Sequence, residues 1–338
     1  MEKTTIPQGY APYLNLYDTQ KAIGLLKRLF EDRLCALLNL YRVSAPLFVE
    51  SGSGLNDDLS GVERAVAFDI LRSEKTAQVV HSLAKWKRMA LKRYGFYPGK
   101  GLCTDMDAIR RDENELDNLH SVYVDQWDWE KVILPENRNL DYLKSTVMDI
   151  VTAICDTQDT MQAMYPRLAS LGKLERRVSF ITSQQLEDMY PGMTSKEREN
   201  AYLREQKTAF IVGIGGKLNS GKPHDGRAPD YDDWELNGDI LFWCDWLDCA
   251  MEISSMGIRV DPESLDRQLT ISGHDERRSL PYHTALLNGE LPLTIGGGIG
   301  QSRLSMLLLG KAHIGEVQAS IWDDETVRIC DQAGIMLL

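Results

Sequence analysis

The chain has 338 residues, enough for one large domain or two with an ample core, and its composition is that of an ordinary globular protein. A net charge of −12 argues against a broad grip on nucleic-acid phosphates, although a local basic patch could still bind tRNA. No apolar run reaches membrane-spanning length and no secretory segment opens the chain. The six cysteines lack C-x-x-C spacing and fit reduced thiols. We therefore expect a cytoplasmic protein that binds neither membranes nor nucleic acid.

The first sixty residues predict a long helix, an extended segment and a glycine-rich loop. Residues 19–40 carry apolar side chains at helical spacing. Residues 41–49 are extended and contain Pro46, which suits a sheet edge or an interface. This order resembles the first motif of class II aminoacyl-tRNA synthetases, which builds a dimer interface, although an ordinary helix–strand hairpin has the same pattern. The loop at 51–61 contains Asp57, and most such loops are solvated surface.

A buried strand and a basic helix come next, at residues 77–83 and 84–94. Four or five cations on one helix could suggest nucleic-acid binding. Such faces are usually just solvated, so this pattern alone predicts that the cations face water.

Two segments at 104–113 and 120–130 predict a pair of strands with an unusual polar face. In the second segment, period-two alternation places Gln126 and Asp128 on one face with two valines. Polar side chains aligned on an inward face must be satisfied by a ligand or by each other. The two strands, with Arg110 near their turn, resemble the second class II motif, which holds the α-phosphate of ATP.

The middle of the chain predicts a long helix at 139–165, a strand at 177–182, two short helices and an apolar run at 209–213. Residues 216–222 match a phosphate-binding P-loop up to its last position. That position is Pro223, where a P-loop needs Ser or Thr to hold Mg²⁺ and a helix behind it. We interpret this stretch as a loop.

Two later strands carry acids that could bind a metal ion. The strand at 236–243 carries Asp239, and the strand at 250–260 carries Glu252 and Ser254, which alternation places on one face. Mg²⁺ prefers carboxylates together with phosphate oxygens, so Asp239 and Glu252 on adjacent strands could share one ion. The alternative is a pair of strand-edge acids without a ligand.

The stretch at 294–309 combines an apolar lead, four glycines in five positions and an apolar helix that Arg303 enters. Glycines weaken a strand, but they let a flat ligand lie directly on the backbone. The dinucleotide pattern G-x-G-x-x-G fails, because its third glycine is Gln301 or Arg303. A glycine floor followed by an arginine resembles the third class II motif, in which the arginine stacks on adenine and meets the ATP phosphates. A glycine-rich turn under a core helix is the alternative.

Taken together, these motifs resemble the ammonia-dependent asparagine synthetases, which are aspartate–ammonia ligases with a class II synthetase-like core. The segments that carry the resemblance, besides the glycine stretch, lie at 81–88, 120–130, 227–234 and 254–259. The resemblance implies an α+β fold with a mainly antiparallel sheet flanked by helices. It also implies a single catalytic domain over 1–338, with an N-terminal extension at 1–18, that forms a homodimer.

The resemblance implies that the chain makes L-asparagine from L-aspartate, ATP and ammonia through a β-aspartyl-adenylate, with Mg²⁺ as cofactor and with release of AMP and pyrophosphate. Catalytic roles would fall on Asp57, Lys87, Arg110 and Arg303. Aspartate would be bound by Ser82, Lys87, Gln126, Asp128, Asp232 and Arg259. ATP would be bound by Arg110, Ser121, Asp239, Glu252, Ser254, Gly298 and Arg303, with the metal on Asp239 and Glu252.

Individual roles follow from the same resemblance. Lys87 and Arg259 would grip the α-carboxylate of aspartate, and Arg110 would bridge the reacting carboxylate and the α-phosphate. Arg303 would meet adenine and the γ-phosphate, and Asp57 would lie near the incoming ammonia.

Two rival classes stay open. One is an aspartyl-adenylate enzyme that charges tRNA, against which the acidic charge and the lack of any segment like an anticodon-binding domain both argue. The other is an inactive synthetase paralogue that serves as a regulatory binding module. Such a paralogue would be expected to lose Arg110, Arg303 or the two metal acids, and all four are present.

Overall fold

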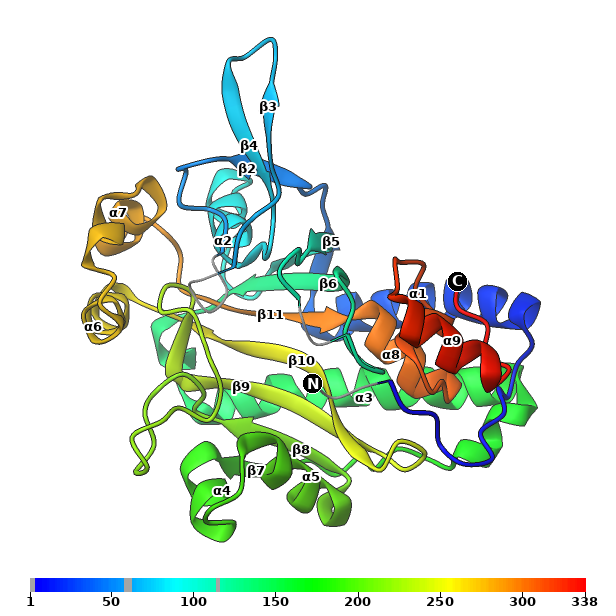
Figure 1. The fold of residues 1–338 in the computed structure, drawn as a ribbon. Coiled ribbons are helices and arrows are strands. Elements are labelled where there is room, and N and C mark those ends of the chain that lie inside the picture. The colour runs from blue at the N-terminus through cyan, green and yellow to red at the C-terminus, as the bar shows by residue number, and fades with distance from the viewer. Residues whose placement is uncertain (1–3, 58–62, 114–115) are drawn as a thin grey trace.

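An eight-stranded sheet forms the centre of the computed structural model, which describes residues 4–57, 63–113 and 116–338. In sheet order (Figure 1) its strands are β1 (Leu40–Arg42), β5 (Gly101–Ile109), β6 (Tyr123–Val132), β11 (Thr294–Gly300), β10 (Cys249–Arg259), β9 (Asp232–Cys244), β8 (Thr208–Val212) and β7 (Ser179–Thr182). Neighbours are antiparallel except at the two edges, where β1–β5 and β7–β8 are parallel. The predicted mainly antiparallel sheet and the α+β class are confirmed.

A smaller sheet holds β2 (Phe48–Glu50), β4 (Lys75–Val79) and β3 (Ala67–Ile70), in that order. Strands β3 and β4 form a hairpin that projects away from the body of the molecule (Figure 1). The single extended segment predicted over 41–49 is wrong in one respect, because the structure divides it between the two sheets. Pro46 lies at the break, where its missing N–H cannot continue a ladder.

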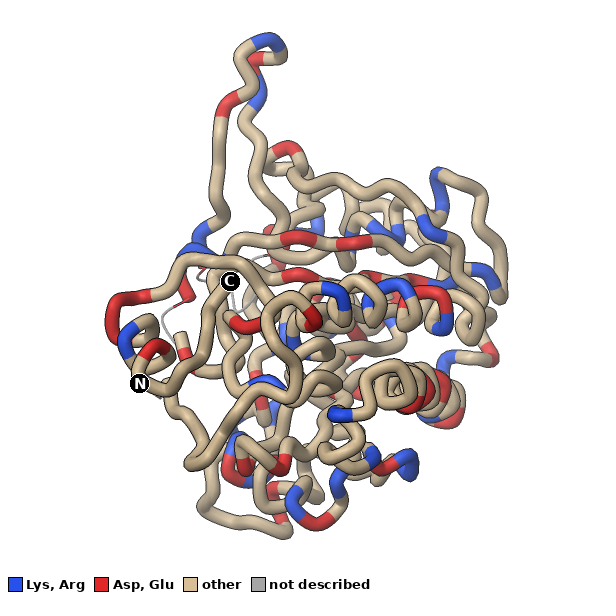
Figure 2. The backbone as a smooth tube through the Cα atoms, turned by 90° about the vertical axis from the view of Figure 1, so that its right-hand side faces the viewer, with Lys and Arg blue, Asp and Glu red and all other residues tan. Residues whose placement is uncertain are grey.

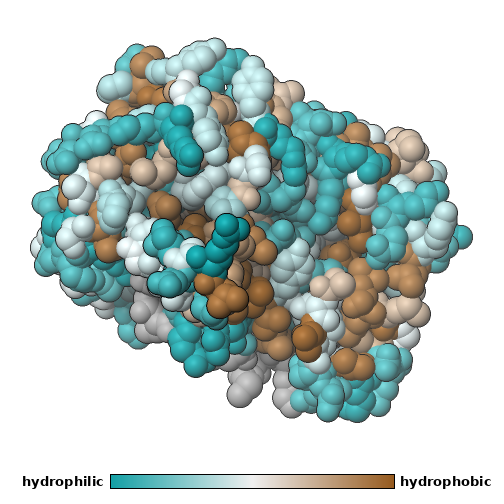
Figure 3. Space-filling model, turned by 90° about the horizontal axis from the view of Figure 1, so that it is seen from above, coloured by the Kyte–Doolittle hydropathy of each residue, from teal (hydrophilic) through white to brown (hydrophobic). Residues whose placement is uncertain are grey.

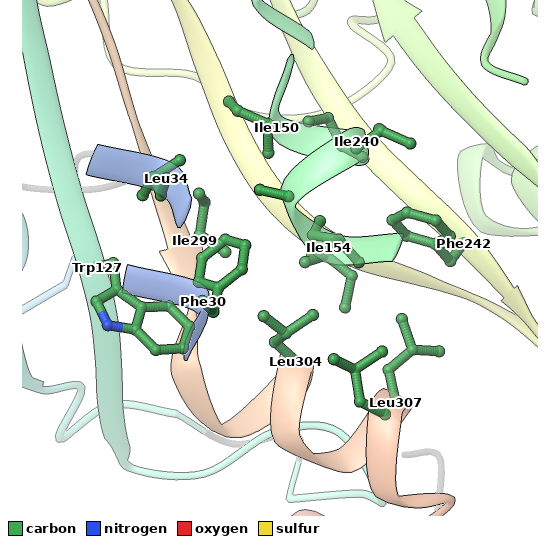
Figure 4. Close-up of a cluster of buried hydrophobic side chains, with 14 of the residues drawn as sticks. Phe30, Leu34, Trp127, Ile150, Ile154, Ile240, Phe242, Ile299, Leu304 and Leu307 are labelled. Carbon is green, nitrogen blue, oxygen red and sulfur yellow. The ribbon is translucent and has the colours of Figure 1, made fainter. Parts of the chain in front are cut away.

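Three helices cover one face of the large sheet. They are α1 (Leu16–Leu38), α3 (Leu140–Met164) and α8 (Gln301–Leu309), and all three were predicted from their apolar spacing. Their buried side chains meet those of β6, β9 and β11 in one cluster, of which Figure 4 labels Phe30, Ile154, Phe242, Ile299 and Leu304. Each of the two long helices begins at an asparagine, Asn15 or Asn139, whose side chain accepts a backbone N–H of the first turn.

The opposite face of the sheet is the one that carries the polar side chains. Trp127 packs against Phe30 of α1 on the helix-covered face, with ring centroids 4.7 Å apart. Since successive residues of a strand point to opposite faces, Gln126 and Asp128 point the other way. There they meet α2 (Ala84–Arg93), whose Lys87 lies 2.8 Å from Asp128.

The remaining helices are α4 (Ser183–Met189), α5 (Ser195–Gln206), α6 (Pro262–Ser272), α7 (Pro281–Leu287) and α9 (Asp324–Gln332). The first two are the predicted pair of short helices. The P-loop-like stretch at 216–222 lies in the connection between β8 and β9 and contains no helix, as expected. In the described part of the chain, no helix combines the length and apolarity needed to cross a membrane. All six cysteines are free thiols.

Acidic and basic positions are interspersed along most elements of the backbone, and acidic positions also fall on the central strands (Figure 2). Two of these are Asp128 and Glu130 of β6, both almost fully buried. Buried acids need cations or hydrogen-bond donors, so the polar face of the sheet is where a site is expected.

His313, near the C-terminal end of α8, makes a pH-dependent contribution to stability. Its Nδ1 accepts a hydrogen bond from the N–H of Gly315 at 3.0 Å, and its ring packs edge-on against Trp322. Burial lowers the pKa of His313 to about 4. The unfolded chain, with a histidine pKa of about 6.5, therefore binds this proton more readily than the folded protein.

The stabilisation that His313 confers is present above pH 6.5 and is lost as the pH falls toward 4. We expect the free energy of unfolding, measured by urea denaturation, to fall by about 3 kcal/mol over this window on account of His313. In His313→Asn the fall over the same window should be smaller by that amount. An unchanged pH dependence in the variant would contradict the assignment to His313.

Candidate active site

A cavity of about 640 Å³ opens on the polar face of the large sheet. This volume is within the range of small-molecule sites. The predicted site residues that line it are Asp57, Ser82, Lys87, Arg110, Gln126, Asp128, Asp232, Glu252, Arg259 and Gly298. They come from α2, β6, β9, β10, β11 and three loops, so segments far apart in the sequence converge on one space.

Strand β11 makes room for the polar side chains of its neighbours. A Cβ atom on Gly296 would stand 2.0 Å from Oε2 of Glu130, and one on Gly298 would stand 2.3 Å from Oε1 of Gln126. Neither space can be filled without moving these side chains. The sequence predicted that a flat ligand would lie on the glycines. At these two positions the side chains of Glu130 and Gln126 lie close to the backbone, while Gly297 and Gly298 line the cavity, so the expectation stays a prediction.

The two cations predicted to grip aspartate share a buried carboxylate. Lys87 Nζ lies 2.8 Å from Oδ2 of Asp128 and 4.0 Å from Oε2 of Glu130, and it donates to the carbonyl oxygen of Gly297 at 3.0 Å. Arg259 Nη2 lies 2.8 Å from the same Glu130 oxygen, and its Nη1 donates to Asp232. Alternating charges therefore form one buried row across the floor of the cavity.

Glu130 belongs to this row although it was not among the predicted site residues. Burial raises the pKa of its carboxyl group, but Arg259 and Lys87 outweigh that effect and hold the pKa below its usual range. Glu130 is thus a permanent anion that fixes both cations. The sequence could have indicated Glu130, because it lies two residues beyond Asp128 and alternation therefore places both side chains on the same face of the strand.

The expectation that the cations of α2 face water is wrong for half of the helix. Lys85, Lys87 and Arg88 are nearly fully buried, whereas Lys92 and Arg93 at the last turn are exposed. The buried cations are compensated individually, as Arg88 donates to two backbone carbonyls and Lys85 pairs with an aspartate. Charge counting along a helix cannot reveal such partners, because they come from distant segments.

A second group of charges lies at the β9–β10 side of the cavity. Arg227 Nη2 lies 2.6 Å from Oδ1 of Asp239. Arg303 Nη1 donates to the carbonyl oxygen of Glu252 at 3.2 Å and lies 3.6 Å from its Oε2. Arg227 and Glu252 line the cavity, whereas their partners Asp239 and Arg303, both predicted to bind ATP, do not. Arg227 opens the motif at 227–234 but had been given no role.

Of the two acids predicted to bind a metal, Glu252 affects the protonation of Asp239. Burial raises the pKa of Asp239 to about 7, and the negative charge of Glu252 acts in the same direction against the lowering effect of Arg227. For Glu252, burial is outweighed by Arg303 and further cations, so its pKa is lowered. Within the described ranges, no group of three or more His, Cys, Asp or Glu side chains is arranged to hold a metal ion.

Two predicted ATP-binding serines lie outside the cavity lining. A β-bulge in β10 shifts the register between Glu252 and Ser254. As a result Ser255, rather than Ser254, lines the cavity together with Glu252, so the predicted common face of Glu252 and Ser254 is wrong. Ser121 donates to Oγ of Ser320 at 2.9 Å and likewise does not line the cavity.

Asp57 also lines the cavity, in a segment that several hydrogen bonds hold in place. Its side chain is almost fully buried, so this part of the predicted surface loop is not solvated. The ring Nδ1 of His81 is 2.9 Å from the carbonyl oxygen of Asp57. The side-chain oxygen of Asn56 accepts the N–H groups of both residues, at 2.8 Å for His81 and 2.9 Å for Asp57. After burial, the charge of Asp57 is the main cause of the raised pKa of Tyr231, another residue of the lining.

Comparisons with known proteins agree on one family. A family model described as aspartate-ammonia ligase matches residues 17–334. A protein from Clostridium perfringens named aspartate–ammonia ligase is 59% identical over 339 residues, covering 100% of both chains. Another of that name from Lactobacillus johnsonii is 57% identical over 335 residues, covering 98% of this chain and 99% of its own.

Solved structures similar to this chain include asparaginyl-tRNA synthetases. The enzyme from Pyrococcus horikoshii complexed with asparaginyl-adenylate superposes with a TM-score of 0.65 at 15% identity, covering 90% of this chain and 70% of that one. The enzyme from Entamoeba histolytica gives a TM-score of 0.64 at 14% identity, covering 90% of this chain and 66% of that one. At such identities the likeness establishes the class II synthetase-like fold.

Proposed function

This chain belongs to the aspartate–ammonia ligase family, and from that premise we propose which residues carry out each step of its reaction. The enzyme makes L-asparagine from L-aspartate, ATP and ammonia by way of a β-aspartyl-adenylate, with release of AMP and pyrophosphate. The observation that carries the assignment is one cavity that is lined by residues of the buried charge row, by Arg227 and Glu252 of the second charged group, and by Asp57.

Adenylation is the first step, because a carboxylate is a poor electrophile until it gains a leaving group. Bringing the anionic substrate to a polyphosphate requires cations in the site. Arg110 bridges the β-carboxylate of aspartate and the α-phosphate, and Arg303 stacks on adenine and contacts the γ-phosphate. Arg227, which lines the same side, adds a third positive charge near the phosphates.

Aspartate is held by the charge row. Lys87 and Arg259 bind its α-carboxylate, and Glu130 keeps both cations in position. Asp128 and Asp232, assisted by Ser82 and Gln126, bind its ammonium group. Lys87 and Arg259 fix the α-carboxylate of the substrate, and Arg110 fixes its second carboxylate. The distance between the two groups of cations favours aspartate over glutamate, which is longer.

Asp239 and Glu252 fit a Mg²⁺ ion that accompanies ATP. Besides burial, the negative charge of Glu252 raises the pKa of Asp239, and this repulsion supports the role because a divalent cation between the two carboxylates would relieve it. When bound, the ion would neutralise phosphate charge. In its absence Arg227 and Arg303 hold the two carboxylates in place.

The ammonia step takes place at Asp57. Ammonia attacks the activated carbonyl carbon through its lone pair, the nitrogen then carries a surplus proton, and AMP departs as the tetrahedral intermediate collapses. The carboxylate of Asp57 accepts that proton, which is general-base catalysis.

The enzyme acts as a cytoplasmic homodimer with one catalytic domain and does not bind nucleic acid. Exposed apolar residues in and near the extended segment at 41–49 and on the β3–β4 hairpin support self-association. They are Tyr41, Leu47, Phe48, Phe68 and Leu71. Figure 3, viewed from the side of this hairpin, shows hydrophobic residues among the hydrophilic surface of that face. An interface between two copies would cover them.

The nucleotide product tests this function directly. With aspartate, ammonium and Mg²⁺ present, ATP should be converted to AMP and pyrophosphate in step with asparagine. Without ammonium, aspartate alone should support ATP–pyrophosphate exchange. Formation of ADP and phosphate would contradict the adenylate route, and transfer of aspartate to tRNA would favour the rival synthetase class.

A further inference from the structure

A second cavity, of about 210 Å³, backs onto the ammonia end of the active site. The two cavities share three segments of chain. Asn56 lines the small one and the next residue, Asp57, lines the large one. Lys85 lines the small cavity, whereas Ala84 and Lys87 on either side of it line the large one. Asp230 lines the small cavity, whereas the next residue, Tyr231, lines the large one. At each of these three segments, one stretch of backbone therefore separates the two cavities.

Two buried polar atoms beside the small cavity lack a hydrogen-bond partner among the described residues. Asp230 is fully buried, and its Oδ2 lies 3.0 Å from Lys85 Nζ, 3.0 Å from Arg277 Nη1 and 2.9 Å from Nε2 of His283. Its other oxygen, Oδ1, has no hydrogen-bond partner among the described residues, and neither has Nδ1 of His283. That nitrogen is 3.5 Å from where a Cβ of Gly54 would stand, so it faces the loop that lines the cavity.

The charges around the small cavity favour a neutral occupant. Lys85 and Arg277 balance Asp230 and Glu50, so neither a cation nor an anion gains from entering. When His283 donates from Nε2 to Asp230, its Nδ1 carries a lone pair that needs an N–H or O–H donor.

We propose that this cavity is the entrance for neutral ammonia, which passes the wall at Asn56 and reaches the adenylate beside Asp57. The proposal rests on the proposed function, since it concerns the third substrate of that reaction. ATP and aspartate occupy the large cavity before ammonia reacts, so the direct approach to the carbonyl is filled when ammonia must arrive. Entry from behind avoids that obstacle and delivers the form of nitrogen that has a lone pair.

Filling the small cavity from either of two walls tests the route. Ser53 and Leu280 line it from the loop and from the segment before α7, and neither lines the large cavity. In Ser53→Trp and in Leu280→Trp, kcat/KM for ammonia should fall by about tenfold or more. Aspartate-dependent ATP–pyrophosphate exchange should stay at the wild-type rate. Ser51→Trp, on the same loop but outside the cavity lining, is the matched control and should leave both rates unchanged.

Hydroxylamine separates a blocked entrance from a disturbed Asp57. Hydroxylamine is larger than ammonia and neutral at the assay pH. A tryptophan that blocks the entrance should therefore slow the reaction with hydroxylamine at least as much as the reaction with ammonia. Recovery of the rate with hydroxylamine would instead mean that the tryptophans act on Asp57, and the proposed route would be wrong. Wild-type kcat/KM for ammonia in both variants, or an equal fall in exchange, would also overturn it.

Failure of the proposed function itself is distinguishable from failure of the route. In that case the wild-type protein would show no aspartate-dependent exchange and would form no asparagine. The route is judged only by how the two tryptophan variants differ from a wild type that does both.

Discussion

Replacing Arg303 with alanine should slow aspartate-dependent ATP–pyrophosphate exchange by roughly thirty-fold to several thousand-fold, which corresponds to about 2–5 kcal/mol. The proposed contacts with adenine and the γ-phosphate would be lost together. The guanidinium is positioned for this role by Glu252, whose carbonyl oxygen accepts a hydrogen bond from Nη1 at 3.2 Å. A fixed orientation matters because stacking and phosphate contact both depend on the plane of the group.

The same substitution should also lower the apparent affinity for Mg²⁺–ATP, because the proposed contacts of Arg303 with adenine and the γ-phosphate are lost. Arg303→Lys should recover only part of the rate, because an ammonium group neither stacks nor binds two oxygens in a plane.

Arg328→Ala is a suitable control for the loss of a positive charge. Arg328 lies on α9 and donates to Gln332 one turn further along the same helix. Its removal should leave the exchange rate unchanged. Near-wild-type exchange in Arg303→Ala would remove Arg303 from the active site.

The sequence was most informative where one element determines the outcome by itself. The apolar spacing of α1 and α3 predicted both helices to within a few residues, because each buries one continuous stripe. Alternation in β6 placed Gln126 and Asp128 on the polar face for the same reason. Tertiary neighbours do not alter such local periodicity.

Prediction failed where a residue's environment is set by distant segments or by a local break in regularity. Because of the β-bulge in β10, Ser255 lines the cavity and Ser254 does not. A prediction from strict alternation assumes a regular strand and cannot reveal the extra residue of a bulge. The buried state of Lys85 depends on Asp230, which is 145 residues away. The partner of Asp239 is Arg227, from the loop before β9, and only the folded chain brings the two side chains together.

Asp57→Asn should separate the two half-reactions. Exchange of ATP with pyrophosphate in the presence of aspartate should persist, because none of the proposed contacts with ATP is made by Asp57. Asparagine formation should fall by about 10²- to 10⁴-fold, the usual range for loss of a general base. Asparagine has nearly the shape of aspartate, so the hydrogen bonds that Asn56 and His81 make to this segment should be kept.

Hydroxylamine distinguishes proton transfer at Asp57 from substrate binding there. It is already neutral at the assay pH and a stronger nucleophile than ammonia, so it should depend less on a base and restore part of the rate in Asp57→Asn. Asp69→Asn, an exposed acid on the projecting hairpin, is the matched control and should change neither half-reaction. Equal loss of both half-reactions without any gain from hydroxylamine would assign Asp57 to aspartate binding. We propose the proton-transfer role because the row from Lys87 to Asp232 carries both cations and carboxylates, the partners that the two charged ends of an amino acid require.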